Sequence, residues 1–237
     1  MSNKPIVVFY HATSPILAHG LTADMYRKLC NRFVNMCWSW DLEVVHLTTD
    51  PDESFGCVRI VTPGDSKDIV YNREKCFTRY LKYFADPNKI YLFTEPDTEI
   101  LKMWPALPQD VDLSLLYRME VFPHISPSWR LCRTTALPFF ESILTYMNSS
   151  PKGRDWHGDS EAFNKLHTSM YNGLVNPHVT EFVMFDKVRI QFRSYEDYMK
   201  PRCTYMRHYI AEQKRELLNK ETRDAKAKPK SPTCKRT

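Results

Sequence analysis

Residues 89–99 read KIYLFTEPDTE, in which a short apolar run passes directly into an acidic cluster. The apolar run is too short for a helix and rich in residues that favour strands, so it predicts a buried strand. Glu95, Asp97 and Glu99 follow it within five positions. Such a cluster places several carboxylate oxygens at the carboxyl end of a strand, where a divalent cation could bind them. A solvated acidic turn is the alternative interpretation of the same residues.

Strands and helices alternate upstream of this stretch. Residues 5–11, 42–48 and 58–61 are short apolar runs that predict strands. Helices are predicted from Thr22, which can cap the first one, and over residues 71–84, where apolar side chains recur at helical spacing. We therefore predict an α/β fold, a Rossmann-like and mainly parallel sheet flanked by helices, whose ligands bind at the carboxyl ends of the strands.

The chain beyond the acidic cluster is rich in proline and aromatic residues, which predicts irregular connections between short elements. The helix predicted from residue 137 has Pro138 in its first turn, a position that proline favours. Asp159 can cap the helix that follows. The sequence shows no repeat or second domain, so residues 1–218 are predicted to form one domain. The remaining predicted elements are strands at 113–118, 182–185 and 187–192 and a last helix at 205–218.

The composition of the 237-residue chain indicates a globular protein. Apolar residues make up 43% and charged residues 26%, which excludes disordered and collagen-like chains. Six glycines against 16 prolines argue against a glycine-rich phosphate loop. The seven cysteines are scattered and include no CxxC pair, so they are predicted to be reduced thiols. Without a secretory signal or an apolar run of about 18 residues, the sequence predicts a soluble, cytoplasmic protein with no membrane contact.

Most of the net charge of +5 lies at the C-terminal end. Residues 221–237 carry six basic and two acidic side chains and no aromatic residue. We predict that residues 219–237 form a disordered basic tail, because this segment has too little apolar surface to fold. The tail is either a solubilising terminus or a weak attraction to nucleic acid or another polyanion.

The order of several short motifs resembles the GT-A class of nucleotide-sugar glycosyltransferases. That class has a Rossmann-like N-terminal half, an arginine-bearing helix and an apolar strand that ends in an acidic motif of the DxD or ExD type. Here Arg73 and Arg79 lie on the second predicted helix, and Glu95-Pro96-Asp97 ends the predicted strand. Residues 158–164 (GDSEAFN) resemble the helix start that carries a DQxxxN motif in that class.

A further motif of this resemblance lies late in the chain. Residues 207–214 (RHYIAEQK) are similar to the segment that contributes a histidine to the metal and a lysine to the diphosphate in glycogenin-like members. The sequence departs from the family in two places: Glu95 replaces the first aspartate of the acidic motif, and Ala211 replaces a glycine. The resemblance spans residues 5–214.

The resemblance implies a divalent cation, Mn²⁺ or Mg²⁺, as cofactor. Asp97 would be its principal ligand, Glu95 a second ligand or a ribose contact, and His208 a further ligand through its neutral imidazole. The acidic motif could instead take the register of Asp97 and Glu99. His208 could also be an interfacial residue on the last helix.

The resemblance also implies which groups bind the donor and the acceptor. Lys214, together with Arg73 or Arg79, would bind the diphosphate. Asp159 or Glu161 would lie near the sugar and the acceptor, where it would orient hydroxyls or take the acceptor proton.

At the end of the first strand, His11 and Thr13 would lie near the nucleobase and ribose of the donor. The resemblance as a whole implies a metal-dependent enzyme that moves a sugar from a nucleotide-diphosphate sugar to an acceptor hydroxyl. The size and the basic tail of the chain suit an intracellular acceptor, for which a modified base in phage or viral DNA is one candidate.

Two alternatives belong to other classes of protein. The same acidic strand end could serve a nucleotidyltransferase or a phosphotransferase of similar fold. A non-catalytic protein could instead bind nucleic acid or a partner through its basic tail, with an acidic turn that is only structural.

Overall fold

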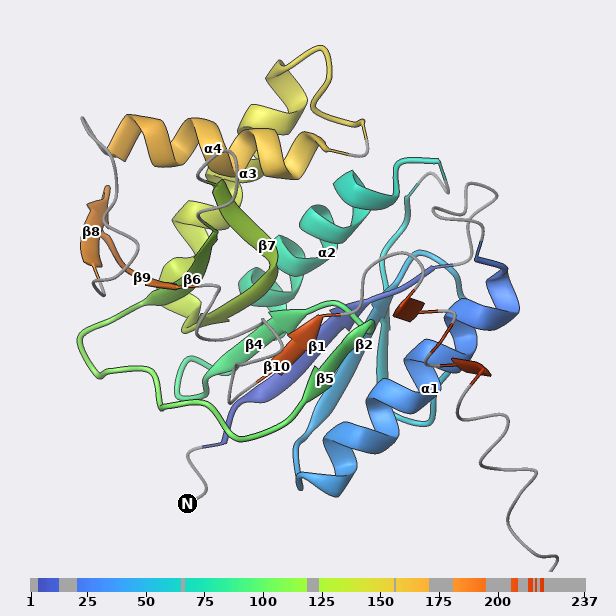
Figure 1. Ribbon diagram of the computed structural model, residues 1–237. Coiled ribbons are helices and arrows are strands. Elements are labelled where there is room, and N and C mark those ends of the chain that lie inside the picture. The colour runs from blue at the N-terminus through green and yellow to red at the C-terminus, as the bar shows by residue number, and fades with distance from the viewer. Residues whose placement is uncertain are drawn as a thin grey trace, which may run out of the picture.

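A β-sheet forms the middle layer of the computed structural model (Figure 1). Its strands are β1 (Ile6–Tyr10), β2 (Val44–Thr48), β3 (Val58–Val61), β4 (Tyr91–Thr94), β6 (Leu113–Arg118), β7 (His124–Cys132), β8 (Glu181–Phe185) and β9 (Val188–Ser194). A second sheet pairs β5 (Thr98–Ile100) with β10 (Met206–His208). The helices are α1 (Ala23–Ser39), α2 (Ile69–Tyr83), α3 (Leu137–Ser149), preceded by a 3₁₀ turn at Thr134–Ala136, and α4 (Gly158–Met170). The structure describes residues 4–12, 21–64, 67–118, 124–155, 157–170, 181–194, 206–208, 213, 214, 216, 218 and 219.

The strand order of the large sheet is β3-β2-β1-β4-β7-β6-β9-β8. The four strands β3, β2, β1 and β4 are parallel to one another, as are β6 and β9. β7 runs antiparallel to both of its neighbours, and β8 runs antiparallel to β9. The predicted α/β class, with a mainly parallel sheet flanked by helices, is confirmed.

β1 shows why the central strands are apolar along their whole length. Val7 and Phe9 point to one face of the sheet, where they pack with Phe33 of α1. Val8 and Tyr10 point to the other face, where they join the cluster that includes side chains of α2. Successive side chains of a strand alternate between the faces, so a strand covered on both sides needs apolar residues at every position.

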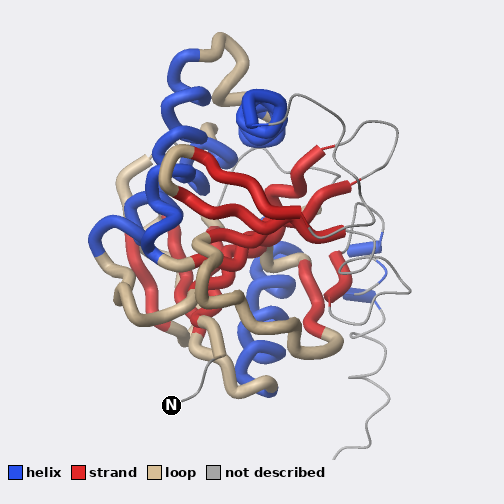
Figure 2. Tube along the Cα trace, turned by 90° about the vertical axis from the view of Figure 1, so that its left-hand side faces the viewer, coloured by secondary structure: helices blue, strands red, loops and turns tan. Residues whose placement is uncertain are grey.

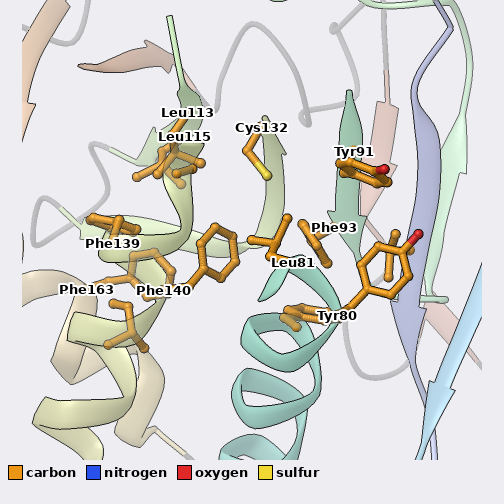
Figure 3. Close-up of a cluster of buried hydrophobic side chains, with 14 of the residues drawn as sticks. Tyr80, Leu81, Tyr91, Phe93, Leu113, Leu115, Cys132, Phe139, Phe140 and Phe163 are labelled. Atoms are coloured by element: carbon orange, nitrogen blue, oxygen red, sulfur yellow. The ribbon is translucent and has the colours of Figure 1, made fainter. Parts of the chain in front are cut away.

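Helices cover both faces of the sheet (Figures 1 and 2). α1 packs on one face, and α2, α3 and α4 pack on the other. On the second face, Phe93 of β4 lies 4.7 Å from Phe77 of α2 and 5.4 Å from Phe140 of α3, measured between ring centroids. Figure 3 shows this cluster, with Phe93 next to Leu81 and with Phe139 and Phe140 to one side of them. The tilted rings fill the space between the sheet and the helices.

Two predicted helix starts are confirmed. The Thr22 side chain accepts a hydrogen bond from the backbone N–H of Met25, 3.2 Å away, and caps α1. Pro138 lies in the first turn of α3, where backbone N–H groups have no acceptor within the helix, so the N–H that proline lacks costs no hydrogen bond. α4 begins at Gly158, so Asp159 lies inside its first turn.

The sequence interpretation was wrong about part of the second half of the chain. It placed residues 206–208 in a helix, whereas they form β10 and pair with β5. It also missed β5 and β7. These strands exist because a partner far away in the chain offers backbone hydrogen bonds, and periodicity within a short segment does not reveal such a partner.

The end of the chain is described only in part. The described positions 213, 214, 216, 218 and 219 are helical, in agreement with the predicted last helix. Leu218 packs with Leu21 and with Leu29 of α1. The predicted tail lies outside the described residues except for Asn219. None of the described helices combines the length and the apolar character needed to cross a membrane.

Candidate active site

The carboxyl ends of β1, β2 and β4 lie at one edge of the sheet, because these strands are parallel neighbours. His11 follows β1, and the acidic turn follows β4. α2 follows the parallel strand β3, so its first turns lie at the same edge. Open α/β sheets bind ligands at this edge. We call it the charged edge; it comprises Arg73, Glu95, Asp97, Asp159 and Lys214.

Arg73 is the centre of the charged edge. One terminal nitrogen of its guanidinium donates to Glu95, and the other donates to Asp159. Its Nε donates to Oε1 of Glu74 over 3.1 Å. Arg73 is only 9% exposed, so these ion pairs are largely removed from water. The fold thereby joins α2, the turn after β4 and the first turn of α4.

The electrostatics of this cluster keep Arg73 charged. Burial alone would lower the pKa of Arg73, but the carboxylates of Asp159, Glu95 and Glu74 raise it above its ordinary value. Burial raises the pKa of Asp159 above its ordinary value, although the ion pair with Arg73 opposes this shift. Oδ1 of Asp159 also accepts from the backbone N–H of Ser160 over 2.7 Å. Asp159 therefore serves both the start of α4 and the pair with Arg73.

A second, fully buried ion pair lies behind Arg73. Glu74 is 1% exposed, and its Oε1 accepts from Arg130 of β7 over 2.7 Å. Arg130 is completely buried. Neither Glu74 nor Arg130 was predicted from the sequence as part of the site. The available signal was the position of Glu74 on the apolar stripe of α2, where a carboxylate requires a buried partner.

Asp97 and Lys214 form the other pair of the charged edge. Oδ2 of Asp97 accepts a hydrogen bond from the Lys214 ammonium, and the two residues are 6% and 7% exposed. Burial alone would lower the pKa of Lys214, but the Asp97 carboxylate raises it above its ordinary value. Lys214 and Asp97 also act on Tyr26, whose pKa is raised, chiefly by burial. Tyr26, in the first turn of α1, therefore lies close to this pair and was not anticipated from the sequence.

His11 lies at one corner of this region. Its ring stacks on Tyr26, with 5.9 Å between the centroids and 16° between the planes. Its Nε2 is 3.7 Å from Oε2 of Glu53. Burial lowers the pKa of His11, and the nearby Glu53 carboxylate opposes this shift. Thr13, the other predicted donor contact, lies outside the described residues.

Three of the candidate residues face elsewhere. Arg79 is exposed on α2, and its guanidinium lies 5.9 Å from the centroid of the Tyr83 ring. Glu161 accepts a hydrogen bond from the Tyr146 hydroxyl over 3.0 Å, which turns it toward α3. Glu99 lies in β5 and pairs with Arg32 of α1 over 3.0 Å.

The donor chemistry of the charged edge suits a divalent cation. Glu95 and Asp97 provide carboxylate oxygens from one turn, which Mg²⁺ and Mn²⁺ prefer. Within the described part of the chain, no cluster of three His, Cys, Asp or Glu side chains surrounds a common point. The backbone of His208 lies opposite Thr98 in the β5–β10 pair, one residue from Asp97, while its side chain lies outside the described set.

The fold is similar to that of a solved glycosyltransferase. A glycosyltransferase involved in the glycosylation of the major capsid of PBCV-1 matches with a TM-score of 0.57 and 9% sequence identity, over 91% of this chain and 100% of that chain. An active-site mutant of LgtC matches with a TM-score of 0.47 and 10% identity, over 90% of this chain and 95% of that chain. No protein-family model matches the sequence, and no curated protein matches it. The first of these similarities shows that the chain has a GT-A-like fold.

Proposed function

We propose that this protein is a glycosyltransferase that moves a sugar from a nucleotide-diphosphate sugar to an acceptor hydroxyl. The observation that carries the proposal is the position of Arg73 between Glu95 and Asp159, at the ligand-binding edge of a GT-A-like fold. These residues belong to three separate elements, and a buried cluster of opposite charges is costly unless it has good geometry or a function.

Two cations of the charged edge are suited to the donor diphosphate. Arg73 presents a planar guanidinium that can bind two phosphate oxygens at once. Lys214 presents a compact ammonium next to Asp97. Both are paired with carboxylates in the free protein, so binding of the diphosphate requires these pairs to rearrange or to share their donors.

Asp97 and Glu95 would hold a divalent cation, with His208 as a further ligand. When bound, the cation would neutralise the charge that develops on the leaving diphosphate. Asp97 would be the principal ligand. Glu95 and Asp97 already pair with Arg73 and Lys214 respectively, so binding of the cation also requires these pairs to rearrange. We favour the Glu95–Asp97 register over Asp97–Glu99, since Glu95 and Asp97 both lie at the charged edge, whereas Glu99 lies in β5 and turns toward Arg32 of α1.

The transfer breaks the bond between the anomeric carbon of the sugar and the diphosphate oxygen, and the electron pair leaves with the diphosphate. A new bond forms between the anomeric carbon and the acceptor oxygen. We assign Asp159 as the general base that takes the proton from the acceptor hydroxyl. Its raised pKa makes its carboxylate a stronger base than an ordinary aspartate. We do not assign a role to Glu161, because its hydrogen bond with Tyr146 turns it toward α3 and not toward the charged edge.

His11 and Tyr26 are suited to the nucleoside part of the donor. Their stacked rings provide an aromatic surface at the end of β1. A nucleobase or a ribose can pack against such a surface while the diphosphate reaches Arg73 and Lys214.

Thermal unfolding with a panel of nucleoside diphosphates, with and without Mn²⁺, tests the donor part of the proposal. A ligand at 100 times its Kd stabilises the folded state by about 2.7 kcal/mol. We expect a Mn²⁺-dependent rise in Tm with one nucleotide, which would also identify the donor base. The absence of a shift with every nucleotide, in a protein that unfolds cooperatively, would contradict the proposal.

Substitution of Asp97 tests the catalytic part. We expect Asp97→Asn to abolish Mn²⁺-dependent turnover of the donor while the circular dichroism spectrum stays that of a folded protein. Glu141→Gln is the matched control, because Glu141 pairs with Lys82 on the surface and lies outside the charged edge. Full Mn²⁺-dependent activity in Asp97→Asn would remove Asp97 from the site.

We further propose DNA as the macromolecule that carries the acceptor hydroxyl, on the strength of the basic residues at 221–237. Phosphate contacts release counterions, so the KM for DNA should rise steeply between 50 and 200 mM salt. Replacement of Lys226, Lys228 and Lys230 by alanine should reduce this salt dependence. A KM for DNA that does not respond to salt would argue against this acceptor.

A further inference from the structure

We propose that Glu74 is a positioning residue for the sugar transfer, which rests on the proposed function of Arg73. Glu74 does not itself reach the charged edge. Its carboxylate accepts hydrogen bonds from Arg130 and from Nε of Arg73. This contact orients the guanidinium of Arg73 so that its two terminal nitrogens face Glu95 and Asp159.

The contacts of Glu74 are those of a bridge between two arginines. Oε1 of Glu74 accepts from Nε of Arg73 over 3.1 Å and from a terminal nitrogen of Arg130 over 2.7 Å. Oε2 accepts from the other terminal nitrogen of Arg130. A guanidinium is planar, so a fixed partner on its Nε side sets the direction of its remaining donors.

Arg130 is in turn held by the hydrophobic core. Its guanidinium carbon lies 4.7 Å from the ring centroid of Phe163, 5.3 Å from that of Phe77 and 5.6 Å from that of Phe140. These rings come from α4, α2 and α3, and Arg130 itself comes from β7. The rings hold the guanidinium in place by packing and by cation–π attraction, so the partner of Glu74 has a fixed position.

The charges of this arrangement allow the positioning effect to be isolated. Burial alone would raise the pKa of Glu74, but Arg130 and Arg73 lower it below its ordinary value, so Glu74 is charged at neutral pH. Replacement of Glu74 and Arg130 together removes one negative and one positive charge. The net charge around Arg73 then stays the same, and only the support of its Nε side is lost.

A purely structural ion pair behaves differently from a positioning pair. Buried ion pairs can often be replaced as a unit by uncharged residues without loss of stability. If Glu74 and Arg130 only satisfy each other, their joint replacement should leave the transfer reaction unchanged. If Glu74 positions Arg73, the joint replacement should impair the reaction, and only while Arg73 is present.

The test is a double-mutant cycle between the pair substitution Glu74→Met/Arg130→Met, which leaves no acceptor for the Arg73 Nε–H, and the substitution Arg73→Lys. We expect the pair substitution to lower kcat/KM by about tenfold or more in the wild-type background. In the Arg73→Lys background the pair substitution should not lower kcat/KM any further, because lysine lacks the guanidinium Nε–H that Glu74 binds. The joint replacement of the exposed pair Lys82 and Glu141 serves as the matched control, with unchanged kcat/KM.

A second readout does not depend on activity. The Nε–H group of Arg73 should give a slowly exchanging side-chain NMR signal in the wild type, and this signal should broaden or exchange faster in Glu74→Met/Arg130→Met. If the pair variant does not fold, Glu74→Asp, which keeps the charge but shortens the side chain, takes its place in both experiments.

Each outcome decides the proposal. Additive losses in the cycle, an unchanged kcat/KM in the folded pair variant, or an unchanged Arg73 signal would overturn the positioning role. If the wild type transfers no sugar from any donor, the proposed function fails on its own, and the Arg73 signal still decides whether Glu74 holds Arg73.

Discussion

The two halves of the central sheet differ in strand direction and in how far apart in the sequence the paired strands lie. In the first half, β3, β2, β1 and β4 are parallel, and α1 and α2 connect strands close in sequence. In the second half, β7 runs antiparallel to its neighbours, and β6 pairs with β9 although α3 and α4 lie between them in the chain. The first half follows from repeated local units, whereas the second depends on partners distant in the sequence.

The charged edge lies where the two halves meet. β4 of the first half pairs with β7 of the second, with Phe93 opposite Arg130. Glu74 and Arg130 cross the same boundary as a buried ion pair. Arg73 and Glu95 come from the first half, and Asp159 comes from the second. The candidate site is therefore completed only when both halves are in place.

The largest expected effect comes from breaking the buried pair at this boundary. We expect Arg130→Met alone to lower the free energy of unfolding by about 3 to 5 kcal/mol, because it leaves Glu74 buried without its principal partner. Lys82→Met, which breaks an exposed pair, should lower the free energy of unfolding far less. Urea unfolding measures both changes. Equal losses in the two variants would show that the boundary does not depend on Arg130.

A second comparison concerns the strands themselves. Leu92 of β4 is fully buried, so Leu92→Ala should cost about 3 kcal/mol through lost transfer energy and the cavity left behind. Met184 of β8 is 57% exposed at the other end of the sheet, so Met184→Ala should cost about 0.5 kcal/mol or less. Urea unfolding of the two variants measures the difference in the free energy of unfolding. A larger loss for Met184→Ala than for Leu92→Ala would show that β8 contributes more to stability than β4.

The pH dependence of stability should be centred in the first half. Burial lowers the pKa of His46 in β2 to about 4, although its hydrogen bond with the carbonyl of His11 opposes this shift. The unfolded chain binds a proton near pH 6.5 and the folded chain does not, so stability is complete above pH 6.5 and falls as the pH decreases toward 4. We expect a loss of about 2 kcal/mol between pH 7.5 and 5.0 from this group.

The variant His46→Gln tests this assignment. Glutamine keeps a donor for the carbonyl of His11 and does not titrate, so the variant should lose less stability than the wild type over the same pH range. Unfolding in urea at pH 7.5 and at pH 5.0 measures the difference. An identical loss in wild type and variant would assign the pH dependence to another group, such as His11, whose pKa burial also lowers.

The last comparison concerns the helix cap of α1 in the first half. Thr22→Ala removes the hydroxyl that accepts from Met25 and should cost about 1 kcal/mol. Thr22→Ser keeps the hydroxyl and serves as the control. Thermal unfolding of the two variants checks the cap, and equal Tm values would show that the hydroxyl does not stabilise α1.

The contrast between the halves also explains how far sequence interpretation reached. Apolar runs covered on both faces, such as β1 and β4, carry their pattern in a few consecutive residues, and both were predicted. β5 and β10 are short strands that mix polar and apolar residues. Each of them is a strand because the other pairs with it. The acidic residues of the turn after β4 were identified in advance. That Glu95 pairs with Arg73 of α2 and Glu99 with Arg32 of α1 depends on how the two helices pack around the turn.

The sequence by itself determined the α/β class, the helix starts at Thr22 and Pro138, and the acidic residues at the end of β4, because these depend on local periodicity, capping and strand length. Only the tertiary structure decided that Arg73 meets Asp159, 86 residues away, that Arg79 on the same helix faces solvent, and that Glu74 bridges two arginines. Local patterns record which side of an element is buried. The partner of a buried charge is set by how distant elements pack, and that packing is a property of the whole chain.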